Sequence, residues 1–288
     1  MLKNLYTDQM KQFFRVVFGR GIIVKISLGI IILFVLAASL APILTPFTPY
    51  EQDLTQLFAK PSAEHLLGTD NIGRDLLTRL LYGARISLVT SLLSSIWGGL
   101  IGITLGLIAG YFTGFASSVI MRIIDAQLSI PSLILSMILA MVVGNSIFEI
   151  SIVIGIGAIP AYTRMVYGMV LSLKNNDFIT AASLVGQSDS KILIKHLLPN
   201  CFAPLIVIFT MSLGIAIMVE AGLAYLGVGI SLPTPAWGCM VSEGYKYLVL
   251  HPRLAILPGL CVMLVVVSFN IVGDGLRDAL DPRLRGKL

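Results

Sequence analysis

Six apolar stretches, each about 20 residues or longer, constrain this chain more than any other feature of its sequence. They occupy residues 22–44, 86–110, 117–143, 147–171, 203–228 and 254–273. A helix needs about 20 apolar residues to cross a hydrocarbon core roughly 30 Å thick. Since a spanning helix satisfies its backbone hydrogen bonds internally, the pattern predicts an all-α, polytopic transmembrane helical bundle of about six spans.

Composition supports a membrane setting and argues against nucleic acid as a partner. Hydrophobic residues make up 56% of the chain, charged residues only 12%, and the mean hydropathy is +0.91, whereas soluble domains are about a quarter charged. The net charge of +5 comes from Lys and Arg residues dispersed between the apolar stretches rather than gathered in one basic patch. We therefore expect contact with membrane lipid and none with nucleic acid.

The distribution of basic residues predicts an orientation in the cell (inner) membrane. The amino-terminal tail, residues 1–21, and the carboxyl-terminal tail, residues 277–288, are both rich in Lys and Arg, so the positive-inside rule places both termini in the cytoplasm. Three arginines in the predicted extracytoplasmic loop, residues 45–85, run against the rule. Residues 22–44 are longer than the core of a secretory signal, which favours an uncleaved first transmembrane helix over a cleaved leader.

One polar segment between the fourth and fifth stretches, residues 177–200, has the signals of a helix, a bend and a second helix. Asp177 is suited to cap the first helix, and Gly186 to end it in the left-handed conformation. Ser188 or Asp189 is suited to cap a second helix reaching Pro199. Small alanines on the first helix would let another protein approach its backbone closely, as a docking element requires.

This segment resembles the coupling motif of ABC importer permeases. Five residues fall in register with that motif, and two positions depart from it, with Thr180 where the family often has Glu and His196 where it often has Ile. The matching residues are Ala181, Ala182, Gly186, Leu198 and Pro199. Residues 65–88, 233–244 and 270–285 also resemble the dipeptide, oligopeptide and nickel group of these permeases.

The resemblance implies a type I ABC importer permease whose core, residues 86–276, holds five transmembrane helices and the coupling segment. It implies a second homologous permease subunit, two cytoplasmic ATPase subunits that bind ATP and magnesium, and an extracytoplasmic solute-binding protein. The cargo would be a small peptide or a related solute such as nickel or a metal chelate. The chain has no Gly-rich phosphate-binding loop ending in Gly-Lys-Ser/Thr, so we expect a transporter subunit that is not an enzyme and has no cofactor of its own.

Proline and ionisable residues mark special points within the spans. Pro131 should kink the third span, because proline removes a backbone hydrogen bond. Glu220 lies in the fifth span, where an ionisable group is costly in lipid; the sequence leaves open whether it faces the pore or partner permease or makes a structural helix–helix hydrogen bond. Arg122 and Asp125 are spaced for an interfacial pair, and Arg164 should extend toward the cytoplasm.

Two charged residues before the second span are further candidates. Arg74 and Asp75 would either contact the solute-binding protein or order the outer loop, and ordering is favoured because the leucines that follow have an amphipathic helical pattern. The three histidines, His65, His196 and His251, are too scattered to predict a metal site.

The alternative function is an ion-gradient-driven secondary transporter acting without ATPase partners. Such folds commonly have two related halves with interrupted helices and buried ionisable groups, and the sequence has no paired halves and few such groups. An intramembrane hydrolase is disfavoured because no metalloprotease or nucleophile-elbow motif is present.

Overall fold

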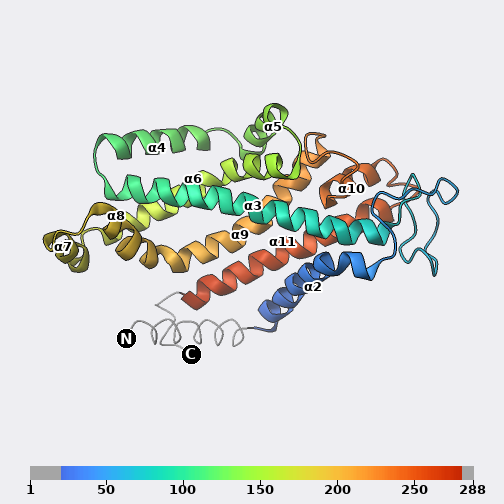
Figure 1. The fold of residues 1–288 in the computed structure, drawn as a ribbon, viewed down its shortest axis with the longest axis horizontal. Coiled ribbons are helices and arrows are strands. Elements are labelled where there is room, and N and C mark those ends of the chain that lie inside the picture. Colours follow the sequence, from blue (N-terminus) through green and yellow to red (C-terminus); the bar gives the residue numbers. More distant parts are fainter. Residues whose placement is uncertain (1–20, 281–288) are drawn as a thin grey trace.

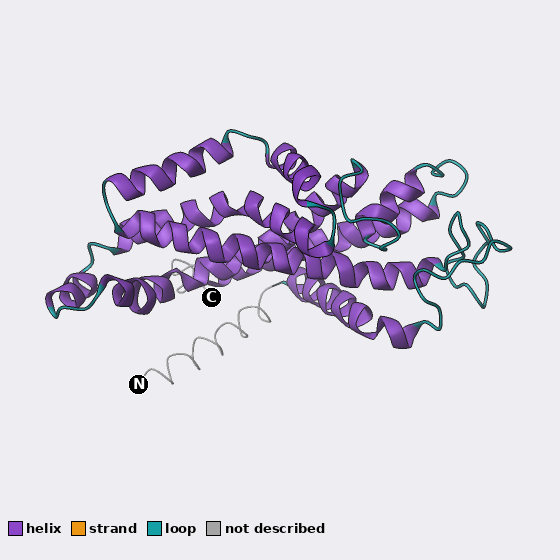
Figure 2. Ribbon diagram, turned by 45° about the horizontal axis from the view of Figure 1, so that its top comes forward, coloured by secondary structure: helices purple, strands orange, loops and turns teal. Residues whose placement is uncertain are grey.

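The computed structural model describes residues 21–280, and all regular elements within that range are helices (Figures 1 and 2). The predicted terminal tails, residues 1–21 and 277–288, lie largely outside the described residues. The helices are α2 (Ile22–Leu44), α3 (Leu76–Tyr111), α4 (Phe115–Leu128), α5 (Ser132–Val143), α6 (Ile147–Leu173), α7 (Asp177–Leu184), α8 (Asp189–Ile192), the π-helical turn η1 (Leu193–Leu197), α9 (Leu198–Tyr225), α10 (Trp237–Tyr245) and α11 (Arg253–Leu280).

The long helices form an elongated bundle with α3 and α6 along its middle (Figure 1). Helices α7 and α8 lie at one end, whereas α10 and the loop before α3 lie at the other. Five helices are long and apolar enough to cross a membrane, and the bent pair α4–α5 makes a sixth candidate span. The described residues thus have five to six candidate spans, in agreement with the prediction of about six.

A ridge of glycines on α3 brings this helix against α6. A methyl group at Gly98, Gly102, Gly106 or Gly110 would lie within 2.6–2.7 Å of α6 atoms, so each of these positions requires glycine. Such spacing of small residues every fourth position is typical of closely packed transmembrane helices. The contacts on α6 advance from Gly155 to Val170 as those on α3 advance, which makes the two helices parallel.

The parallel arrangement of α3 and α6 requires the chain between them to return to the opposite end of the bundle. Helices α4 and α5 make this return as a broken span, bent by 94°. The break follows Leu128, and Pro131 is the N-cap residue of α5. The predicted kink at Pro131 is therefore confirmed, and it is a full break between two helices. Proline explains the position of the break but not its angle.

Helix α4 is tied to α6 by two polar contacts. Gln127 Nε2 donates to the Ile156 carbonyl at 2.6 Å, an acceptor left free because Pro160, four residues later, has no N–H. Asp125 pairs with Arg164 at 2.6 Å on half-exposed side chains. The predicted Arg122–Asp125 pair is therefore wrong, since the carboxylate of Asp125 bonds across helices instead.

Two helix boundaries differ from the prediction. The second span begins at Leu76 rather than Ile86, so the amphipathic segment before it is the first part of α3. The fifth span begins at Leu198 rather than Ala203, and α8, η1 and α9 form one continuous helical run. A π-helical turn directly before Pro199 joins α8 to α9, and its Leu198 N–H bonds the Leu193 carbonyl. This i→i+5 turn is wider than an α-helical turn.

Candidate functional site

The protruding α7–α8 segment has the predicted bend at Gly186. Its φ is +77°, in the left-handed region that favours glycine. The Gly186 N–H bonds the Ser183 carbonyl at 2.9 Å and the Gln187 N–H bonds the Ala182 carbonyl at 3.1 Å, which together make a Schellman motif. No atom lies within 4 Å of a methyl group placed on Gly186, so backbone conformation rather than space selects glycine.

The two faces of α7 have different surroundings. Ile179 and Ala182 are buried in an apolar cluster with side chains of α3, α6 and α9. The carboxyl end of α7 is open, where Leu184 is 83% and the capping residue Val185 81% exposed, and Thr180 and Ala181 are also exposed. An exposed apolar end on an anchored helix is suited to docking another protein, and Leu184 and Val185 were not among the predicted site residues.

The remaining predicted residues of this segment lie where it joins α9. His196 is half-buried in the π-helical turn, and its Nε2 lies 2.9 Å from Gln187 Oε1 across the bend. Leu198 is half-buried and Pro199 is exposed at the first turn of α9. The hydroxyl of Tyr111 donates to Asp189 Oδ1 at 2.8 Å, which ties α8 to the end of α3.

At the opposite end of the bundle, three buried residues and the half-buried Glu243 form a network, here called the four-charge cluster: Asp70, Arg74, Arg79 and Glu243. Arg74 Nε donates to Asp70 Oδ2 at 2.6 Å, and the Arg74 and Arg79 guanidiniums donate to the two oxygens of Glu243 at 3.1 and 2.7 Å. Buried charges are tolerated when they are paired, and here Glu243 of α10 pairs with Arg74 and Arg79 at the start of α3. The network therefore holds α10 against the start of α3.

Asp75 acts within the same chain as a helix cap. Its Oδ2 accepts from the Thr78 N–H and hydroxyl, both at 2.7 Å, and its Oδ1 lies 2.9 Å from His65 Nδ1. Arg74 and Asp75 are both almost fully buried. Their contacts order the loop before α3, and their side chains offer little surface to another protein in this conformation.

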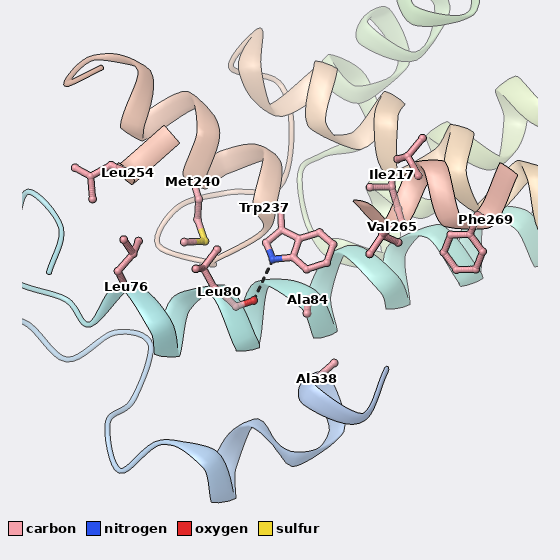
Figure 3. Packing of buried hydrophobic residues seen from close by; sticks show 11 residues of the cluster. Ala38, Leu76, Leu80, Ala84, Ile217, Trp237, Met240, Leu254, Val265 and Phe269 are labelled. Carbon is pink, nitrogen blue, oxygen red and sulfur yellow. Dashed lines mark hydrogen bonds between the residues drawn. The ribbon is translucent and has the colours of Figure 1, made fainter. Parts of the chain in front are cut away.

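Glu220 is fully buried between α9, α3 and α10. Its Oε2 accepts from the Ser87 hydroxyl at 3.2 Å, and the Ser87 oxygen in turn accepts from the backbone N–H of Trp237 at 3.2 Å. The indole of Trp237 packs in the apolar cluster drawn in Figure 3 and donates to the Leu80 carbonyl at 3.0 Å. Glu220 therefore links three helices inside one chain and does not face an open surface of this subunit.

Family comparisons agree with this architecture over most of the chain. Residues 102–286 match the family model of the binding-protein-dependent transport system inner membrane component. The chain belongs to this permease family. Residues 23–61, which include all of α2 except Ile22, also match the N-terminal TM domain of oligopeptide transport permease C. This permease is accordingly a multi-pass inner-membrane protein.

Named relatives cover nearly the whole permease. It is 41% identical over 260 residues to the dipeptide transport system permease protein DppC of Alkalihalophilus pseudofirmus, covering 90% of this chain and 86% of the relative. It is 38% identical over 270 residues to the glutathione transport system permease protein GsiD of Salmonella paratyphi A, covering 93% and 89%. These matches confirm the predicted group of ABC importer permeases.

The fold also resembles a solved structure. A chain of the MetNI methionine ABC transporter in an inward-facing conformation matches with a TM-score of 0.58 and 20% identity, covering 70% of this permease and 96% of that chain. This likeness shows the fold alone. The family match makes the permease a non-enzymatic subunit of a binding-protein-dependent ABC importer, which implies binding-protein and ATPase partners. The alternative of a secondary transporter without ATPase partners is set aside.

Within residues 21–280 no group of three or more metal-ligating side chains is close enough to hold an ion.

Proposed function

We propose that this permease imports a dipeptide, glutathione or a similar small peptide, and that its α7–bend–α8 segment docks on an ATPase subunit in the cytoplasm. The names of the relatives support the cargo class. The docking role rests on one observation, the anchored helix α7 that presents Leu184 and Val185 to its surroundings. Thr180, Ala181, Ala182, Gly186, His196, Leu198 and Pro199 form or support this coupling segment.

The full assembly contains this permease, a second homologous permease subunit, two ATPase subunits and an extracytoplasmic solute-binding protein. ATP and magnesium bind the ATPase subunits, and this chain carries no cofactor. Both termini lie in the cytoplasm, on the side of α7. The family's dependence on a binding protein supports the external partner.

The arrangement of helices supports a direct mechanical route from ATPase to membrane. When the ATPase subunits close, they displace α7, and the continuous run of α8, η1 and α9 carries that displacement into the fifth span. ATP binding then favours one of two states of the pathway over the other, which is alternating access driven by differential binding.

Uptake by reconstituted vesicles tests the proposal. The permease, copurified with its partner subunits, is supplied with the solute-binding protein and labelled dipeptide, glutathione, oligopeptide or chelated nickel. ATP is present or absent on the side of the vesicle membrane that holds the ATPase subunits. ATP-dependent uptake of dipeptide or glutathione is expected. Uptake of nickel alone would overturn the cargo class, and uptake driven by an ion gradient without ATP would overturn the assembly.

Substitution at the bend tests the coupling segment. Gly186→Val should abolish uptake while membrane insertion persists, because a β-branched residue resists φ near +77°. Gly168→Ala is the matched control, since Gly168 lies inside α6 with no atom within 4 Å of an added methyl group. Normal uptake by Gly186→Val would count against the coupling assignment.

A further inference from the structure

The bend at Gly186 has little packing to stiffen it. Gly186 has no neighbour within 4 Å of an added methyl group, and Leu184, Val185 and Ser188 beside it are exposed. The backbone hydrogen bonds of the Schellman motif fix the end of α7, but they do not join α7 to the helix that follows. The apolar packing of Ile179 and Ala182 against the base of α9 holds one face of α7. A further contact across the bend would add to the transfer of a displacement from α7 to α9.

Besides this apolar packing, one side-chain hydrogen bond among residues 21–280 crosses the bend. Gln187 is the first residue after Gly186, and its N–H donates to the Ala182 carbonyl. This hydrogen bond fixes Gln187 to the end of α7. Gln187 Oε1 lies 2.9 Å from Nε2 of His196. Because an amide oxygen only accepts, the imidazole Nε2–H is the donor in this contact.

The position of His196 makes this contact mechanically direct. His196 lies in η1, the turn that continues into α9, and the Asn200 side chain donates to its carbonyl at 2.7 Å. Leu197 beside it is completely buried in the cluster that also receives Ile179 and Ala182 of α7. The His196–Gln187 bond therefore joins the end of α7 to the base of the fifth span.

We propose that the His196–Gln187 hydrogen bond is a brace that makes α7 and α9 move as one body, so that His196 is a positioning residue for energy coupling. This inference rests on the proposed function. Without the brace, the ATPase still binds α7 and hydrolyses ATP, but a smaller part of each displacement reaches α9. The number of solute molecules moved for each ATP hydrolysed therefore decreases.

The test measures that ratio in vesicles containing the complete complex with its binding protein, using a labelled alanyl-alanine dipeptide and labelled glutathione as probes. His196→Leu and Gln187→Leu each remove one partner and keep an apolar side chain of similar size. Either variant should lower the transport-to-hydrolysis ratio about three- to tenfold, the range that one hydrogen bond contributes to an equilibrium. The double variant should lose no more than each single variant, since the same bond is absent in all three.

Two further variants separate a brace from a general structural role. His196→Gln retains a donor that reaches Gln187, so it should restore much of the ratio. Ser172→Ala removes a hydrogen bond of 2.8 Å to the Met169 carbonyl within α6, and it should leave the ratio unchanged. Copurified ATPase should remain at the level of the unmodified complex in every variant.

The outcomes are distinguishable from failure of the proposed function. If the unmodified complex shows no ATPase subunit or no ATP-dependent uptake, the proposed function fails. If it transports and His196→Leu keeps the ratio, the brace is refuted. Loss of ATPase binding by His196→Leu or Gln187→Leu also refutes the brace and assigns these residues to the docking surface instead.

Discussion

Glu220 shows what a buried acidic residue does at the scale of single side chains. The sequence left two roles open, a position at the pore or partner interface and a structural hydrogen bond between helices. The side chain is 0% exposed and bonds Ser87, which also accepts from the Trp237 N–H. The Ser87 contact fits the structural role, whereas Glu220 Oε1 is buried without a hydrogen-bond partner among the described residues.

Two substitutions distinguish these roles. Glu220→Gln keeps the shape and an acceptor for Ser87, so we expect uptake and thermal stability near those of the unmodified permease. Glu220→Leu leaves the Ser87 hydroxyl without its acceptor and should lower the free energy of unfolding by about 1–3 kcal/mol, measured by thermal unfolding of the purified complex. A Glu220→Gln permease of normal stability that transports nothing would instead place the carboxylate in the transport pathway.

Which site residues the sequence could reveal depends on how local their signals are. Gly186 was predictable because a glycine between two helical patterns signals a left-handed cap. Leu184 and Val185 were not, since apolar residues at a helix end are typical of a buried core as well. The pairing of Arg79 with Glu243 joins residues 164 positions apart, and no local pattern predicts such a contact.

The same distinction holds for whole elements. The apolar stretches predicted the number of spans, but two arginines, Arg79 and Arg85, made the second span appear to begin at Ile86. The helix continues back to Leu76 because Arg79 is neutralised by Glu243 and Asp70, and such pairing makes a buried arginine tolerable. Similarly, Pro131 indicated where the third span bends, whereas a proline does not by itself specify the 94° angle.

The glycine ridge of α3 gives a prediction at this scale. A methyl group at Gly102 would lie 2.6 Å from Tyr162 Cβ and 2.8 Å from the Ile159 carbonyl, whereas one at Gly99 would lie 3.6 Å from the Tyr162 ring. Gly102→Ala should therefore separate α3 from α6 and lower the free energy of unfolding by about 1–3 kcal/mol. Gly99→Ala is the control on the same helix and should be nearly neutral.

Thermal unfolding of both purified variants in detergent measures the difference. Equal unfolding temperatures for Gly102→Ala and Gly99→Ala would show that the α3–α6 interface adapts to added volume. That outcome would contradict the close parallel packing of the two helices.

For the whole molecule, the parallel direction of α3 and α6 constrains membrane topology more strongly than the count of apolar stretches. The chain leaves α3 at the end that holds α7, because Tyr111 bonds Asp189 of α8, and it must re-enter α6 from the other end. The pair α4–α5 makes that crossing despite its bend. With six crossings, the beginning of α2 and the end of α11 fall on the side of α7 (Figure 1). The proposed cytoplasmic position of α7 would then agree with the positive-inside rule for the two basic tails.

Cysteine labelling from either side of the membrane tests this topology, after the native cysteines are replaced. Thr113 is exposed in the turn before α4, and Asn145 is exposed in the turn between α5 and α6. Thr113→Cys should react only with reagent in the cytoplasm and Asn145→Cys only with reagent outside, while reporters fused to both termini should be cytoplasmic. If both cysteines reacted from the same side, α4–α5 would be a re-entrant hairpin, and α3 and α6 could not both span the membrane in the same direction.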